Sequence, residues 1–218
     1  MIGIVAILAG AFSFLLILAN ILTSTHTTTS DQQLTLFNSN QSLYAFLGAA
    51  AALFGAFGVA FAAGFSRLVW ERSQGVSFAA AFLVATGSLV IAIADNVYVG
   101  GLFAISQAPS TPAYALDATY LAAVMDNFTN SLTPLSTLLS GLGMLFFASA
   151  IWKRGVLPRW LSYVVLVGGV LGILSSAFRF ATSQPEGISM IFIFGFVVLF
   201  SIWGIGVGMT LLRGRSPL

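Results

Sequence analysis

The side chains best suited to chemistry in this sequence are a few charged and amide groups that interrupt apolar segments. Asp95 and Asn96 lie within the run GSLVIAIADNVYVGG, and Arg179 lies within another apolar run. Because an isolated charge near hydrocarbon is costly, ionisable residues in such segments pair with other polar groups or mark functional sites. We therefore expect these residues to form either a structural pair or part of a binding site.

The composition is that of an integral membrane protein. Of the 218 residues, 58% are hydrophobic and 6% are charged, and the mean hydropathy is +1.00. Soluble domains, by contrast, contain about 25% charged residues. The pI of about 9.3 rests on a formal charge of only +2, and the basic residues are spread among loops. We expect the lipid bilayer as a partner and no nucleic acid.

Catalytic and metal-binding patterns are missing from the sequence. It contains no cysteine and a single histidine, His26, which argues against thiolate metal sites, iron–sulfur clusters and bis-histidine haem ligation within this chain. No HExxH or Walker A motif occurs. Asp95 and Asp126 could serve as acid and base if they approached each other. We nevertheless predict a non-catalytic protein with no metal site and no cofactor.

Six apolar segments reach the roughly 20 residues that a bilayer-spanning helix requires. We therefore predict an all-α, six-helix transmembrane bundle that forms one domain over residues 1–218. The first segment lacks a basic leader and a convincing cleavage site, so we expect a retained helix. The predicted helices cover residues 2–23, 43–65, 77–105, 133–152, 160–181 and 188–212.

Basic residues predict the orientation of the bundle. Seven of the eight lie in the junctions after the second, fourth and sixth helices, and the opposite loops contain no Lys or Arg. The positive-inside rule then places both termini in the cytoplasm, with residues 24–42 and 106–131 outside. The seven residues are Arg67, Arg72, Lys153, Arg154, Arg159, Arg213 and Arg215.

Helix geometry predicts a polar layer at the outer membrane boundary. At about 1.5 Å per residue, Asp95 lies about 27 Å from Ser77, and Arg179 about 28 Å from Trp160. Asn20 reaches a similar height on the first helix. We predict that Asp95 and Arg179 form either a structural ion pair or the floor of an outward-facing pocket for an ion, headgroup or small solute. The proposed cluster comprises Asp95, Asn96, Arg179, Asn20 and Asp126.

The two long exterior segments differ in character. Residues 24–42 are rich in Thr and Ser, which predicts a polar loop. In residues 107–131, apolar side chains recur every fourth position from Leu116 to Phe128. This spacing predicts a short amphipathic outer helix, with Pro134 starting or kinking the helix that follows.

Small residues predict close helix packing. Gly168 and Gly172 form one GxxxG pair, and Gly204 and Gly208 form another. Such faces join helices within one chain or between subunits. The 20 Phe residues are expected to cover lipid-facing surface and fill gaps in the bundle. Aromatic clefts also accept quinones, carotenoid pigments or lipid chains, so binding of these groups stays open.

One stretch resembles a known group of proteins. Residues 141–174, GLGMLFFASAIWKRGVLPRWLSYVVLVGGVLGIL, are similar to part of uncharacterised six-helix bacterial membrane proteins that are catalogued as a domain of unknown function. The match rests on the basic turn, Pro158 and the glycines that follow it. The resemblance implies the six-helix topology and a prokaryotic inner or plasma membrane, and it implies no activity.

Two functions remain as the main expectations. Small-residue faces and the lack of catalytic residues favour an accessory or structural subunit of a larger membrane complex, with other membrane proteins as partners. The alternative is binding or transport of a small molecule, lipid or ion through the pocket around Asp95 and Arg179. No clear inverted repeat supports transport.

Overall fold

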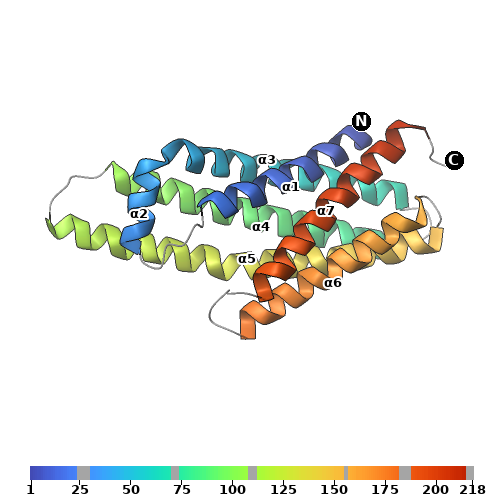
Figure 1. Ribbon diagram of the computed structural model, residues 1–218. Coiled ribbons are helices and arrows are strands. Elements are labelled where there is room, and N and C mark those ends of the chain that lie inside the picture. Colours follow the sequence, from blue (N-terminus) through green and yellow to red (C-terminus); the bar gives the residue numbers. More distant parts are fainter. Residues whose placement is uncertain (24–29, 70–73, 108–111, 155–156, 182–187, 215–218) are drawn as a thin grey trace.

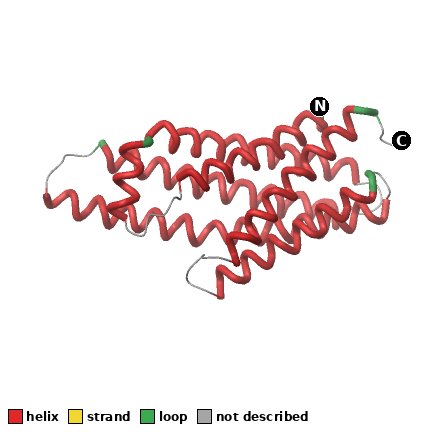
Figure 2. Tube along the Cα trace, in the orientation of Figure 1, coloured by secondary structure: helices red, strands yellow, loops and turns green. Residues whose placement is uncertain are grey.

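The computed structural model consists of α-helices joined by short connections (Figure 1). It describes residues 1–23, 30–69, 74–107, 112–154, 157–181 and 188–214, and these residues contain no strand (Figure 2). The helices are α1 (Ile2–Thr23), α2 (Ser30–Ser39), α3 (Gln41–Val69), α4 (Gln74–Ser106), α5 (Pro112–Arg154), α6 (Arg159–Ala181) and α7 (Ile188–Leu212).

Six of these helices are long and apolar enough to cross a membrane, which confirms the predicted number of spans. Only α2 is too short. The first residues of α1 and the last residues of α7 lie at the same end of the bundle (Figure 1). We call it the terminal end, and we call the opposite end, where α2 lies, the α2 end.

The six long helices form a closed ring. Around the ring the order is α1, α3, α4, α5, α6 and α7, and α7 returns to pack against α1. Each helix therefore packs mainly against two neighbours. One consequence matters for the site: α3 separates α1 from α4, and α5 separates α4 from α6.

Glycines close the ring by allowing backbones to approach. A Cβ added at Gly204 of α7 would lie 2.9 Å from the Ala6 carbonyl oxygen of α1, and one at Gly10 would lie 2.7 Å from the Ser201 carbonyl oxygen. On α6, a Cβ at Gly172 would lie 2.8 Å from the Phe196 ring of α7. Both predicted GxxxG faces are therefore used within the chain.

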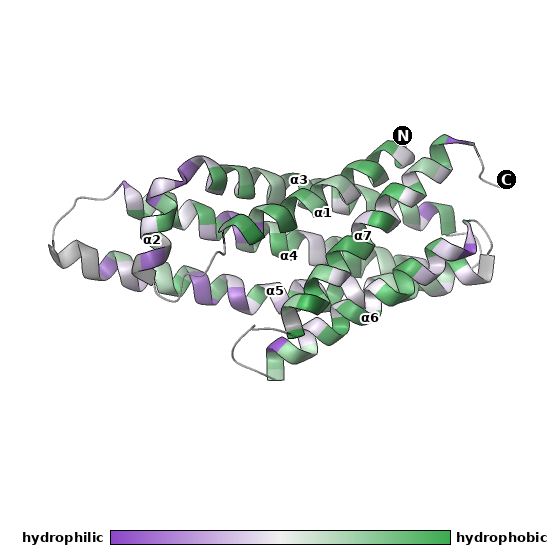
Figure 3. Ribbon diagram, in the orientation of Figure 1, coloured by the Kyte–Doolittle hydropathy of each residue, from purple (hydrophilic) through white to green (hydrophobic). Residues whose placement is uncertain are grey.

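The fourth span differs from the prediction. Instead of a separate outer helix followed by a span, α5 is a single helix of 43 residues with Pro134 inside it. At about 1.5 Å per residue it is about 65 Å long, roughly twice the thickness of the hydrocarbon core. The helix continues because its first half packs against α2 and the long helix α4. The part of α5 beside α2 mixes hydrophilic and hydrophobic residues (Figure 3).

A short helix occurs instead in the segment predicted to be a loop. α2 packs against α3, α4 and α5, and its Phe37 is fully buried. The Phe37 ring lies 5.1 Å from the ring of Tyr44 on α3 and 4.9 Å from that of Phe103 on α4. These contacts hold α2 across the end of the bundle.

Aromatic side chains from three helices fill the interior of the bundle in its terminal half. Trp203 of α7 is fully buried, and its ring lies 4.9 Å from Phe61, 5.4 Å from Phe65 and 5.7 Å from Phe147. Phe200 lies 5.9 Å from Trp203. We call these five residues the aromatic core. They join α3, α5 and α7 across the inside of the bundle.

Candidate functional site: a polar cluster at the α2 end

Asp95 lies inside the helix ring. Its side chain is only 3% exposed, and its hydrogen-bond partner is the side-chain amide of Asn20 on α1. Because α3 lies between α1 and α4 in the ring, this hydrogen bond crosses the bundle interior. The structure therefore brings together two of the residues that the sequence placed at one depth.

The Asp95 carboxyl group is only partly satisfied. Its Oδ2 atom is buried and has no hydrogen-bond partner. The Asn20 amide is shared, because its Nδ2 also donates to the Leu16 carbonyl oxygen at 3.1 Å. An unsatisfied buried polar group costs about 1–3 kcal/mol, and more if it is charged. Among the described residues, Oδ2 of Asp95 is the one buried carboxyl oxygen without a hydrogen-bond partner.

Two tyrosines that the sequence reasoning missed complete the surroundings of Asp95. Tyr98 follows Asp95 by three residues on α4, and it lies within electrostatic range of both Asp95 and Asp126. The ring of Tyr44 on α3, which is 1% exposed, lies 6.4 Å from the Tyr98 ring. The three-residue spacing could have indicated Tyr98, because residues i and i+3 share a helix face.

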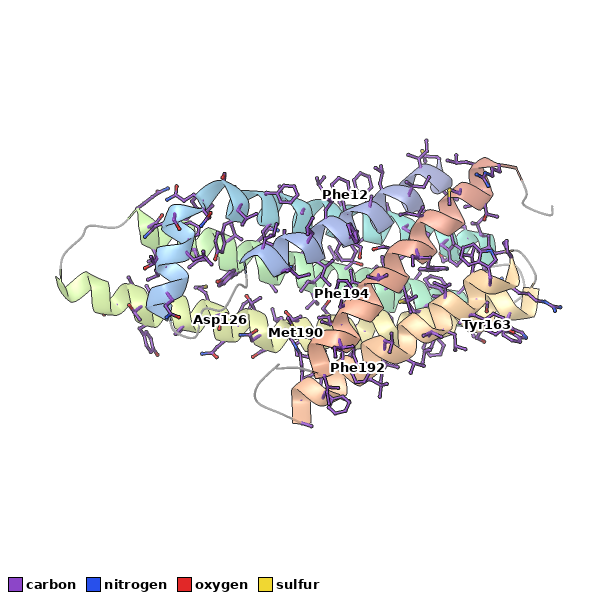
Figure 4. All side chains as sticks on the ribbon, in the orientation of Figure 1. Phe12, Asp126, Tyr163, Met190, Phe192 and Phe194 are labelled. Carbon is purple, nitrogen blue, oxygen red and sulfur yellow. The ribbon has the colours of Figure 1, made fainter. Side chains whose placement is uncertain are left out.

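Asp126 lies on α5 at the same end of the bundle (Figure 4). Its Oδ2 accepts a hydrogen bond from Nδ2 of Asn130 at 3.0 Å. The neighbouring Thr129 hydroxyl donates to the Ala94 carbonyl oxygen at 3.3 Å, which fastens α5 to α4 beside Asp95. We call Asn20, Tyr44, Asp95, Tyr98 and Asp126 the polar cluster.

Asn96 does not belong to this cluster, although it was predicted to. Successive residues on a helix point about 100° apart, since one turn takes 3.6 residues. The Asn96 side chain is exposed, and its Nδ2 donates to the Ala92 carbonyl oxygen at 2.9 Å. Its Oδ1 faces Gly48 of α3, where an added Cβ would lie 3.4 Å away.

The predicted ion pair between Asp95 and Arg179 is not formed. Arg179 donates from Nη2 to the sulfur of Met190 at 4.0 Å, and its Nε has no hydrogen-bond partner. Met190 lies at the start of α7 (Figure 4). The sequence predicts similar depths for the two charges, but α5 separates their helices. The rise per residue predicts the depth of each side chain, but it does not predict the direction in which the side chain points around its helix.

A known protein family matches nearly the whole chain. The chain matches the family described as "Domain of unknown function (DUF4386)" over residues 2–212. The chain belongs to this family. The match confirms the resemblance noted for residues 141–174 and extends it to nearly the whole chain. Searches among curated proteins and among solved structures found no match.

The chemistry of the polar cluster in this DUF4386 protein is acidic. It holds two carboxyl groups, two phenols and one amide, and among the described residues no cationic side chain interacts with Asp95. The described residues also contain no group of three or more His, Cys, Asp or Glu side chains suited to a metal ion. Divalent cations such as Ca²⁺ take six to eight oxygen ligands. The arrangement therefore suits a monovalent cation better than a divalent one.

Proposed function

We propose that this DUF4386 protein is a non-catalytic membrane protein that binds a small monovalent cation inside its helix ring, with Asp95 as the principal ligand. The observation that carries the proposal is the buried Oδ2 atom of Asp95, which has no hydrogen-bond partner. A bound cation would supply the missing interaction. The Asn20 amide already holds the carboxyl group in place.

The separation of Arg179 from Asp95 favours a cation over an anion or a zwitterion. With Arg179 beside Asp95, the guanidinium would have balanced the charge of that carboxylate, and the pair would have suited a polar headgroup. Without it, the carboxyl groups of Asp95 and Asp126 set the local charge. A positive ligand is then the one that reduces the cost of burying Asp95.

Access to Asp95 is proposed to come from the α2 end only. The aromatic core fills the ring on the opposite side of the polar cluster, which supports binding over conduction through the bundle. We further propose that the terminal end faces the cytoplasm of a prokaryotic cell, across its inner or plasma membrane. Arg67, Arg159 and Arg213 lie at helix ends there, as the positive-inside rule requires. The cation would then arrive from outside.

Thermal unfolding of the purified protein in mild detergent tests the proposal. Chloride salts of Na⁺, K⁺ and ammonium are compared at constant ionic strength and pH. We expect at least one of them to raise the unfolding temperature of the wild-type protein, because a ligand at 100 times its Kd stabilises by about 2.7 kcal/mol. Asp95→Asn, which keeps the size of the side chain and removes its charge, should abolish this response.

Asp117→Asn is the matched control, because Asp117 is an exposed carboxylate on α5. It should leave the cation response unchanged. An equal response in wild type and Asp95→Asn would refute the proposed ligand. So would a wild-type protein that responds to none of the three cations.

The accessory-subunit role that the sequence suggested stays a prediction with less support. Its main argument was the small-residue faces, and both GxxxG pairs are used inside the chain. Purification from the native membrane in mild detergent, with mass analysis of co-purifying chains, separates the two roles. A stable partner that buries more than about 1,000 Å² would favour the subunit role, whereas a monodisperse monomer that responds to cations would favour binding.

A further inference from the structure

A small cavity lies at the terminal end, where α5 and α6 meet. Its volume is about 140 Å³, below the 300–1,000 Å³ typical of pockets for drug-sized ligands. It therefore has room for one small group. The residues that line it are Ile151, Trp152, Leu157, Arg159 and Ser162.

Aromatic residues place this cavity at a membrane boundary. Trp152 and Tyr163 are 59% and 51% exposed, and their rings meet edge to face at 5.2 Å. Trp160 is 49% exposed close by. Trp and Tyr concentrate where hydrocarbon meets the lipid headgroups. Tyr163 lies on α6 near the terminal end (Figure 4), so the cavity lies at headgroup level.

The charge at the cavity is positive. Arg159 is exposed, forms no ion pair with another described residue, and has no acidic neighbour in the cavity lining. Two further basic residues, Lys153 and Arg154, precede it in the chain. A guanidinium binds phosphate oxygens in a bidentate manner, which makes Arg well suited to phosphate recognition.

An apolar face continues from the cavity toward the membrane interior. Tyr163, Val167, Val170 and Leu174 are exposed along α6, and their spacing of three or four residues puts them on one side of the helix. A free phosphate ion would make no favourable contact with this apolar face. A lipid would lay an acyl chain along it while its phosphate reached Arg159.

We propose that this cavity binds the phosphate of an anionic phospholipid, with Arg159 as the principal contact and Trp152 as one wall. The site is at the opposite end of the bundle from the polar cluster. It does not depend on cation binding at Asp95. If the terminal end is cytoplasmic, it faces the leaflet in which anionic lipids produce a negative surface potential.

Native mass spectrometry tests the proposal on the full chain in detergent. The protein is mixed with equal amounts of phosphatidylglycerol and phosphatidylcholine that carry the same acyl chains, and the retained lipids are counted. We expect wild type to retain phosphatidylglycerol in preference. Arg159→Gln should lower this retention about tenfold, equivalent to about 1.4 kcal/mol.

Arg67→Gln is the matched control, because Arg67 is an exposed arginine in the last turn of α3 at the same end. It should retain phosphatidylglycerol as wild type does, and size-exclusion chromatography should show both variants folded. Equal losses in the two variants would overturn the proposal in favour of general surface charge. Equal wild-type retention of both lipids would overturn it too. Displacement of the lipid by equimolar inorganic phosphate would assign the cavity to the free ion and overturn the lipid site.

Discussion

The two ends of the helix ring are held together by different forces. At the terminal end, the aromatic core packs ring against ring at centroid distances of 4.9 to 5.9 Å. At the α2 end, the interior is crossed by the hydrogen bond between Asn20 and Asp95, which leaves one carboxyl oxygen without a partner. The terminal end is therefore packed for stability, whereas the α2 end retains a buried polar group that destabilises the fold.

The difference matters more in a membrane than in water. Burial from lipid gives little hydrophobic driving force, so helix association depends on van der Waals packing and interhelical hydrogen bonds. The aromatic core supplies the first, although Nε1 of Trp203 has no hydrogen-bond acceptor. A neutral indole N–H is less costly to leave unpaired than a carboxyl oxygen. Of these two unpartnered groups, Asp95 therefore destabilises the bundle more, and packing alone does not explain its presence.

Removing the centre of the aromatic core should have the largest effect. Trp203→Ala would leave a cavity among Phe61, Phe65 and Phe147, and truncation of a buried Trp costs about 3–5 kcal/mol. Reversible unfolding of the purified protein in mixed micelles measures the loss. Trp160→Ala, at a half-exposed position, is the control and should cost far less. Similar losses for the two variants would mean that the aromatic core is not the more stable end.

Breaking the hydrogen bond at the polar end should have an intermediate effect. Asn20→Ala removes the side-chain partner of Asp95, so the free energy of unfolding should fall by about 1–3 kcal/mol. Asn96→Ala is matched in residue type and lies beside Asp95, but its amide bonds within its own helix. It should change stability by less than about 0.5 kcal/mol. If both variants unfold alike, the hydrogen bond across the ring does not stabilise the bundle.

Neutralising Arg179 should have the smallest effect. Its contact with Met190 is a weak hydrogen bond to sulfur at 4.0 Å, so Arg179→Gln should shift the free energy of unfolding by no more than about 0.5 kcal/mol. Loss of one partner of a buried ion pair would instead cost about 3–5 kcal/mol. The same unfolding assay separates these values. A loss in the larger range would restore Arg179 as the partner of Asp95.

Much of the fold could be predicted from the sequence because a bilayer imposes a single length scale. Apolar run length predicted the six spans, and the distribution of basic residues placed both termini on one side. Residues 141–174 indicated the family. The extension of α5 was not predicted, since Pro134 and the polar residues before it indicate a break locally. Packing against α4 and α2 overrides that local signal. The buried Phe37 likewise makes a helix of a segment whose composition predicts a loop.

For the polar residues within the spans, the sequence by itself predicted the depth of each along its helix. It placed Asn20, Asp95 and Arg179 at one level, because rise per residue is fixed by backbone hydrogen bonding. Only the tertiary structure decided which of them meet. The order of helices around the ring brings Asn20 to Asp95, and it places α5 between Asp95 on α4 and Arg179 on α6. That order depends on contacts such as those of Gly10 with α7, which join residues far apart in the chain.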